Sequence, residues 1–233
     1  MKLHNILLFL MIALPVMTSC SSDDDIEMPS VTPSQEGTFT DERDGYQYHW
    51  VRIGNLEWMT ENSHYDLGDE TKCKFYISYE DHSAGNTDDK YSQKYGFLYT
   101  LEGAKEAAPQ GWRVPTDDDW KALEQALGMT SQEANATEWR GNRQADLLKQ
   151  TDGGTKLGIQ MAGYFTQHTI MATSGYRFMA VYGFYWTQTK DETKDGEFYY
   201  YRKLYYNSGK VYRQSMETTN QLLSVRFVRD AQS

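Results

Sequence analysis

The chain contains few cysteines, few histidines and, after its first residues, no long apolar run. It has two cysteines and five histidines among 233 residues. Two cysteines cannot build the disulfide framework that is typical of small secreted domains. The histidines nearest to Cys73 are His64 and His82, each nine residues away, whereas zinc sites usually include two ligands within a few residues of each other. The sequence therefore predicts neither a bound metal ion nor a disulfide-stabilised fold, and Cys73 is expected to be a buried thiol.

Basic residues are also scarce. Lysine and arginine together number 23, against 33 aspartates and glutamates, which gives a formal net charge of −10. Proteins that bind nucleic acid or an anionic membrane surface use clusters of cations to neutralise phosphates. The composition therefore excludes nucleic acid, and direct attraction to anionic lipid, as expected partners of the folded part of the chain.

The first residues follow the pattern of a bacterial lipoprotein signal. Lys2 precedes an apolar segment, 6–16, which is about 11 residues long and too short for a membrane span of roughly 20 residues. Two small residues directly precede Cys20. We predict that residues 1–19 are a cleaved signal peptide and that acyl chains such as palmitate on Cys20 attach the protein to a membrane. A plain secreted protein with a chance cysteine at this position is the alternative.

Residues 20–38 have the composition of a disordered tether. An acidic run at 23–27 is followed by prolines, serines and threonines, with too few apolar side chains to offset the entropy cost of ordering. The acidic run resembles the export signal that directs lipoproteins of the Bacteroidota to the outer leaflet. The alternative is an ordinary solvated run of charges. On that resemblance we expect an outer-membrane lipoprotein whose domain faces the cell exterior.

Residues 39–233 are predicted to form a single domain, with strands first, helices in the middle and strands last. Turn signals at Asp44-Gly45 and Gly54-Asn55 predict a hairpin of strands 46–53 and 56–60. A long polar loop, 62–94, is expected to contain one short strand at 75–79. Segments rich in aromatic and β-branched residues predict further strands at 159–165, 176–181, 184–187, 197–206, 210–213 and 222–228.

Three helices are predicted, at 102–108, 116–127 and 142–150. The second has the clearest signals, because Thr116 and Asp119 form a capping box and Trp120 lies on its apolar face. The three consecutive acids at 117–119 favour the positive end of the helix dipole. They cannot all face one ion, so the sequence does not predict a calcium site.

In the last predicted strand, 222–228, the alternation of side chains between the two faces is expected to bury the charged residue Arg226. Leu223, Val225 and Phe227 would lie on one side, and Ser224, Arg226 and Val228 on the other. Arg226 is therefore expected to be sequestered and paired, because an unpaired charge in the interior would cost several kcal/mol.

Six blocks of the chain resemble a known family. In order they are Phe39-Thr40-Asp41 with Asp44-Gly45, Val51-Arg52-Ile53-Gly54, Glu57-Trp58-Met59, Tyr95-Gly96-Phe97-Leu98-Tyr99, Gly111-Trp112-Arg113-Val114-Pro115-Thr116 with Trp120, and Ser224-Val225-Arg226-Phe227-Val228-Arg229-Asp230. Together they resemble the Fibrobacter succinogenes major paralogous domain, which is common on surface lipoproteins of Bacteroidota and Fibrobacter. The resemblance implies more about the fold than about the function.

Part of this pattern is in turn similar to the formylglycine-generating-enzyme branch of the C-type-lectin-like fold. That similarity implies an α+β fold with C-type-lectin-like, twisted antiparallel sheets, two or three short helices and long loops. Its structural motif would comprise Gly111, Trp112, Arg113, Pro115, Thr116, Trp120 and Arg226. Where the family carries two cysteines this chain has Ala108 and Phe227, and we expect an apolar contact between these residues in place of a disulfide.

No catalytic motif is evident. Formylglycine-generating chemistry relies on a pair of cysteines that binds copper, which the single Cys73 cannot supply. The histidines are scattered, and neither a Gly-x-Ser-x-Gly elbow nor a phosphate loop occurs. A glycosidase would need a pair of carboxylates, and no pair is singled out among the many acidic residues. We therefore expect a protein without enzymatic activity and without a cofactor.

The chain is rich in aromatic residues, which make up 14% of it and include 18 tyrosines. In the strand 197–206, Tyr199, Tyr201, Lys203 and Tyr205 share one face, while Leu204 marks the opposite face as the core side. Tyrosine offers a large contact area at little entropic cost. The predicted ligand-binding residues are Tyr199, Tyr201, Lys203, Tyr205, Trp186 and Trp139. The alternative is that these tyrosines only stabilise strands and cover a small core.

The sequence thus favours a cell-surface binding module for a glycan or for an extracellular or envelope protein. A structural or assembly component of the envelope or of a fimbrial tip is the second hypothesis, and an enzyme of unknown class is the third. A binding module predicts an exposed cluster of three or more aromatic residues beside carboxylates or amides. A structural component predicts an exposed strand edge or a large apolar patch.

Overall fold

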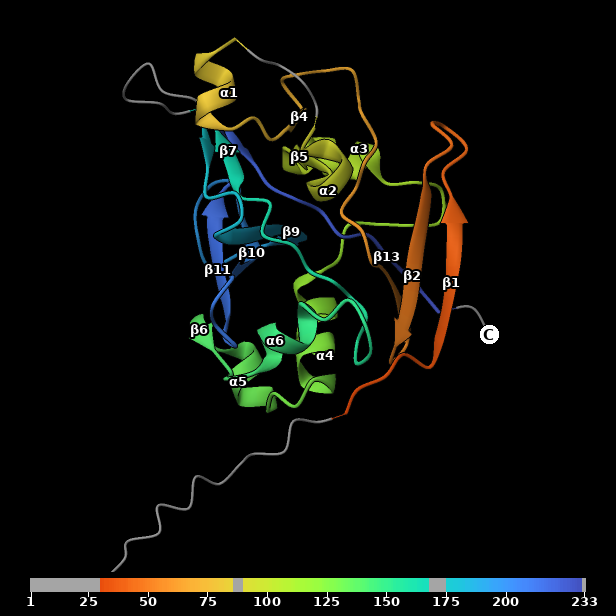
Figure 1. Ribbon diagram of the computed structural model, residues 1–233. Helices are drawn as coiled ribbons and strands as arrows, with labels where there is room; N and C mark the ends of the chain where they lie inside the picture. Colours follow the sequence, from red (N-terminus) through yellow and green to blue (C-terminus); the bar gives the residue numbers. More distant parts are fainter. Residues whose placement is uncertain (1–29, 86–89, 168–174, 232–233) are drawn as a thin grey trace, which may run out of the picture.

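The computed structural model describes residues 30–85, 90–167 and 175–231. The predicted signal peptide 1–19, Cys20 and the first part of the predicted tether lie outside the described residues. Two four-stranded antiparallel sheets form the two sides of the molecule, with helices gathered at its two ends (Figure 1). The described residues therefore have the mixed, mostly antiparallel α+β architecture that the sequence predicts.

The first sheet is built on the predicted hairpin. Its strands, in spatial order, are β1 (Gln35–Thr40), β2 (Gln47–Ile53), β3 (Leu56–Met59) and β13 (Val228–Asp230). Gly54 lies in the tight turn between β2 and β3 with a φ of 63°, a left-handed conformation that glycine adopts without strain. The pairing of β2 with β3 confirms the hairpin.

The tether was predicted to extend too far into this sheet. Its last four residues, 35–38, pair with β2 as part of β1. The backbone N–H of Ser34 also donates to the carbonyl of Arg52 at 2.9 Å, and Val31 packs against the core. Composition did not reveal this order, because most of it comes from backbone hydrogen bonds to a neighbouring strand, which any residue type can make.

The second sheet carries most of the aromatic residues of the C-terminal half. Its strands, in spatial order, are β6 (Glu138–Arg140), β11 (Val211–Glu217), β10 (Phe198–Tyr205) and β9 (Tyr182–Lys190). Two smaller sheets lie beside it. One pairs β4 (Cys73–Phe75) with β5 (Phe97–Tyr99), and the other contains β12 (Gln221–Leu222), β7 (Tyr164–Thr166) and β8 (Tyr176–Arg177).

Several predicted strands are shorter than expected. Residues 159–162 form mostly buried chain without strand pairing, and Gly163 makes only an isolated bridge with Gly183. The segment 176–181 contains only the two residues of β8, and 222–228 contributes only its first residue to β12 and its last to β13. The segments 159–163 and 222–228 are apolar because they are almost completely buried, whereas 176–181 is partly exposed. Apolar content alone therefore overestimated how much of the chain pairs as strands.

Three helices lie where the sequence predicts them, and three more were missed. The predicted ones are α3 (Leu101–Ala107), α4 (Asp117–Ala126) and α6 (Gln144–Leu148); the others are α1 (Tyr79–Ser83), α2 (Ser92–Tyr95) and α5 (Ser131–Asn135). The capping box of Thr116 and Asp119 on α4 is confirmed, and Thr130 and Glu133 form a second one on α5. Within the described ranges, no helix combines the length and apolar character needed to cross a membrane.

The C-terminal segment passes through the middle of the molecule between the two large sheets (Figure 1). All seven residues from 222 to 228 are buried. Their backbone groups bond to three different sheets, through Tyr99 of β5, Phe184 and Trp186 of β9, and Met59 of β3. The predicted alternation is confirmed, because Val225 and Phe227 belong to one core cluster while Val228 belongs to another. Ala108 packs against the cluster that contains Phe227, where the family resemblance implies a disulfide.

Arg226 lies on this segment and is completely buried. Its guanidinium donates to the carbonyls of Met59 at 3.2 Å, Leu157 at 2.6 Å and Gly158 at 3.2 Å, and to the side-chain oxygen of Asn62 at 3.1 Å. The prediction of a sequestered and paired arginine is therefore confirmed, although these four partners are neutral oxygens and not carboxylates.

A buried network of charges joins α4 to the second sheet. Arg202 of β10 contacts Glu124 and Asp117, each at 2.7 Å. Arg213 of β11 contacts Asp117 at 2.7 Å, and Arg140 of β6 contacts Glu124 at 2.8 Å. Burial alone would raise the pKa of Asp117, but hydrogen bonds and charge from the two arginines outweigh it and hold the pKa well below its usual range. Three strands are thus fixed to one helix.

Replacing Asp117 by alanine should destabilise the protein by about 3–5 kcal/mol, because Arg202 and Arg213 would stay buried without their shared carboxylate. Urea unfolding measures the change. The matched control is Asp118→Ala, since the neighbouring side chain is 86% exposed and such surface pairs contribute at most about 1 kcal/mol. Equal effects of the two substitutions would contradict a structural role for the network.

His64 makes stability depend on pH. Its ring stacks on Tyr46 with ring centres 4.1 Å apart, and burial, the largest cause, lowers the pKa of His64 from 6.5 to about 4. The unfolded chain therefore binds this proton at a higher pH than the folded protein does. The contribution of the neutral ring to stability is complete above pH 6.5 and is lost as the pH falls toward about 4.

The variant His64→Phe should keep the stacked ring and remove this loss, so its stability should decline less than that of the wild type between pH 6.5 and 4. Denaturant titrations at several pH values test the expectation. His49→Phe serves as the control because the His49 side chain is 60% exposed. A wild-type slope in His64→Phe would show that other groups cause the decline.

Candidate functional site

The candidate site is the face of the second sheet opposite the one that packs on α4. Aromatic rings from its four strands and from the adjoining β7 and β8 region gather there. We call this surface the aromatic face, and it comprises Trp139, Tyr164, Phe178, Tyr182, Phe184, Tyr201, Tyr205 and Tyr212 together with Lys203. The strand register aligns Trp139, Tyr212, Lys203 and Phe184 in one row across the sheet.

The rings of the aromatic face contact one another in a continuous series. Trp139 meets Tyr212 edge to face at 5.2 Å, Tyr212 lies 6.0 Å from Tyr201, and Tyr201 lies 6.3 Å from Phe184. Trp139 remains 38% exposed and Phe178 48% exposed. Such pairs hold each other's orientation. The rings of this surface are therefore already fixed in position before any ligand binds.

Lys203 lies among these rings. Its ammonium nitrogen is 3.8 Å from the ring centre of Tyr212, 5.1 Å from that of Trp139 and 5.8 Å from that of Tyr182. These distances are within the range of a cation–π interaction. Burial lowers the pKa of Lys203, and the carboxylate of Glu138 opposes this shift. The face thus combines aromatic surface with one fixed cation.

A hollow of about 390 Å³ lies at the end of the aromatic face near β7. Rings form most of its lining, and Glu217 and Gln221 add a carboxylate and an amide. Pockets for small molecules have this combination of apolar walls and a few polar groups. Of the rings of the aromatic face, Trp139 and Phe178 are exposed and the others are partly or almost completely buried, so the exposed cluster of three or more aromatic residues expected of a binding module is only partly present.

Not all of the predicted ligand-binding residues belong to this site. Lys203, Tyr205 and Trp139 do, and Tyr201 contributes to the hollow although it is only 7% exposed. Tyr199 lies farther along β10, where Lys105 is 5.5 Å from its ring centre. The prediction for Trp186 is wrong, because this residue has 0% exposure and its indole N–H donates to the carbonyl of Tyr99.

Sequence reasoning missed three rings of the face: Phe178, Phe184 and Tyr212. Tyr212 could have been found, since strand alternation from the buried Val211 places it on the exposed side. Phe178 has a φ of 64° in the turn after β8, and no pattern in the sequence indicates where its side chain would go.

The residues of the predicted structural motif lie away from the aromatic face. Gly111 has a φ of 83°, Trp112 is buried against Arg229, and Arg113 pairs with Asp119 at the start of α4. Pro115 leads into the Thr116 cap, and Trp120 is completely buried in edge-to-face contact with Trp58. These residues connect α4 to the first sheet.

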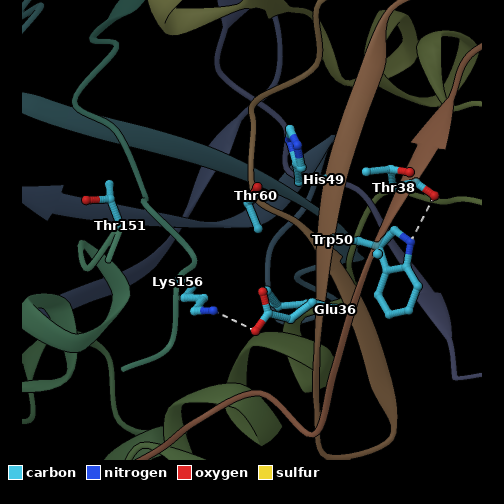
Figure 2. A pocket seen from close by; sticks show the side chains of 9 residues that line it. Glu36, Thr38, His49, Trp50, Thr60, Thr151 and Lys156 are labelled. Atoms are coloured by element: carbon cyan, nitrogen blue, oxygen red, sulfur yellow. Dashed lines mark hydrogen bonds and ion pairs between the residues drawn. The ribbon is translucent and has the colours of Figure 1, made fainter. Parts of the chain in front are cut away.

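A second pocket, of about 380 Å³, lies on the first sheet beside the chain that follows α6 (Figure 2). Its lining is polar and includes Thr60 and Thr151. Its charged groups are already paired, since Lys156 contacts Glu36 at 2.6 Å and His49 contacts Glu61 at 2.7 Å. The charged side chains of this pocket are therefore less available to bind a ligand than Lys203 of the aromatic face.

A third pocket, of about 530 Å³, lies beside Cys73. Its lining includes Phe97 and Phe165, and also Lys74 and Glu70, which pair with each other at 3.2 Å. Among the residues that the structure describes, no group of three or more histidine, cysteine, aspartate or glutamate side chains is arranged to hold a metal ion.

These features describe an antiparallel α+β domain with an aromatic surface on one sheet. The chain belongs to a known family, because the model of the Fibrobacter succinogenes major domain matches residues 51–229. The match begins within β2 and ends within β13, so it includes the whole second sheet and the whole aromatic face, whereas β1 of the first sheet precedes it. Neither the curated proteins nor the solved structures contain a match to the chain.

Cys73 should be unreactive in the folded protein. The thiol is 3% exposed, and burial raises its pKa to about 11, so little of it is the reactive thiolate at neutral pH. A Cys20→Ser variant leaves Cys73 as the single thiol. Labelling by a thiol reagent should be slow in buffer and rapid in urea. Equal rates under both conditions would contradict the burial.

Proposed function

We propose that this protein is a non-catalytic binding module that recognises saccharides through the aromatic face. The observation that carries the proposal is the series of contacting rings from Trp139 to Phe184, with polar side chains beside it. A sugar has an apolar face of C–H groups, which packs on aromatic rings, and hydroxyls, which hydrogen-bond to amides and carboxylates. Glu217 and Gln221 are such polar groups at the hollow.

The proposal includes the location inferred from the sequence. Acyl chains on Cys20 would anchor the protein in the outer membrane, and the acidic tether would place the domain on the cell exterior. A module at that location meets external saccharides directly. The lectin-like assignment of the fold is part of the same proposal, and it rests on the Gly111-Trp112-Arg113 and Ser224-Val225-Arg226 blocks.

A structural or assembly component of the envelope is the second candidate. The strand β1 favours it, because β1 lies at the edge of the first sheet, and an edge strand can pair with a strand of another protein. The aromatic face favours ligand binding more strongly. Its exposed rings are already oriented, whereas the exposed residues of β1 are polar or small, such as Glu36 and Thr38.

Binding of the purified protein to an array of neutral and acidic oligosaccharides tests the proposal. A specific saccharide should bind, and Trp139→Ala should weaken that binding about tenfold, because a ring contact worth about 1.4 kcal/mol corresponds to a factor of ten in Kd. Trp50→Ala is the matched control, since Trp50 lies on the first sheet and is also only partly buried. Absence of binding across the array, or equal losses in both variants, would contradict saccharide recognition by this face.

A further inference from the structure

Lys203 differs from most lysines of this acidic protein. Eight lysines of the described residues form ion pairs with carboxylates: Lys72, Lys74, Lys90, Lys105, Lys121, Lys149, Lys156 and Lys190. Within the same described residues, no carboxylate lies within the 4.0 Å ion-pairing distance of Lys203. A chain with a net charge of −10 thus leaves this half-buried ammonium without an acidic partner.

Lys203 lies where a ligand of the aromatic face could supply the acidic partner that the protein does not. Its ammonium lies within 5.8 Å of the ring centres of Tyr212, Trp139 and Tyr182, so rings replace part of its water shell. The carboxylate that acts on the pKa of Lys203 is that of Glu138, which is exposed at the start of β6. A partly dehydrated cation gains more from an anion in contact than a fully solvated one does.

We propose that the saccharides recognised by the aromatic face carry a carboxylate, as uronic acids do, and that Lys203 binds that group. This inference rests on the proposed function and names its ligand class. A sugar ring stacked on Trp139 brings its substituents within reach of Lys203, which lies in the same cross-strand row with its ammonium 5.1 Å from the Trp139 ring centre. The negative charges elsewhere on the protein oppose this contact weakly, because salt screens exposed charges beyond about 8 Å at physiological ionic strength.

The test compares oligosaccharides that differ only in charge. Several uronic acid oligomers are each measured beside their methyl esters, in which the carboxylate is neutral. The wild-type protein should bind the acids about tenfold more tightly than the esters, which corresponds to about 1.4 kcal/mol. The preference should shrink as the salt concentration rises.

Variants at Lys203 separate its charge from its packing. Lys203→Met keeps an apolar stem between the rings and should abolish the preference for acids, so that acids and esters bind equally. Lys203→Arg should retain the preference, since it keeps the cation. Lys210→Met is the matched control, because Lys210 is exposed just before β11 and should leave both affinities unchanged.

Equal binding of acids and esters by the wild type would overturn the role of Lys203 and leave saccharide recognition intact. A preference for acids that survives in Lys203→Met would overturn it as well. Failure of every acid, ester and neutral oligosaccharide to bind would instead overturn the proposed function itself.

Discussion

The fold depends on a constraint at residues 222–228, where seven consecutive residues have no contact with solvent. A buried peptide group must find a hydrogen-bond partner within the protein, since an unpaired one costs free energy comparable to a lost hydrogen bond. This segment meets the requirement by bonding to β3, β5 and β9, which belong to three different sheets. Arg226 adds its own bonds to the carbonyls of Leu157 and Gly158. The backbone hydrogen bonds of this one buried segment therefore fix the relative positions of the three sheets.

The charge network around α4 has a consequence for the candidate site. Arg202 and Arg213 must point toward Asp117, because a buried guanidinium needs its carboxylate. Successive side chains of a strand point to opposite faces. The neighbouring Lys203 and Tyr212 are therefore directed to the other side of the sheet, where they become part of the aromatic face. The ionic core and the proposed binding surface are two sides of the same two strands.

Local signals predicted the elements that local forces stabilise. The Thr116 capping box, the hairpin at Gly54 and the alternation along β10 all involve residues within a few positions of one another. The same reasoning identified the core side of β10 from Leu204, and it placed Lys203 and Trp139 among the residues of the site. It failed for Trp186, because the carbonyl of Tyr99 that accepts its N–H comes from a strand 87 positions away in the chain.

The sequence by itself determined the helix starts, the main hairpin, the burial of Arg226 and the membership of the family, because each follows from short-range patterns of residue type. Only the tertiary structure decided which rings meet. Trp139, Tyr182 and Tyr212 lie around Lys203 since β6, β11, β10 and β9 pair in that order, and this order is not the order of the chain. Strand order depends on how distant segments share one core, so no local pattern of residues specifies it.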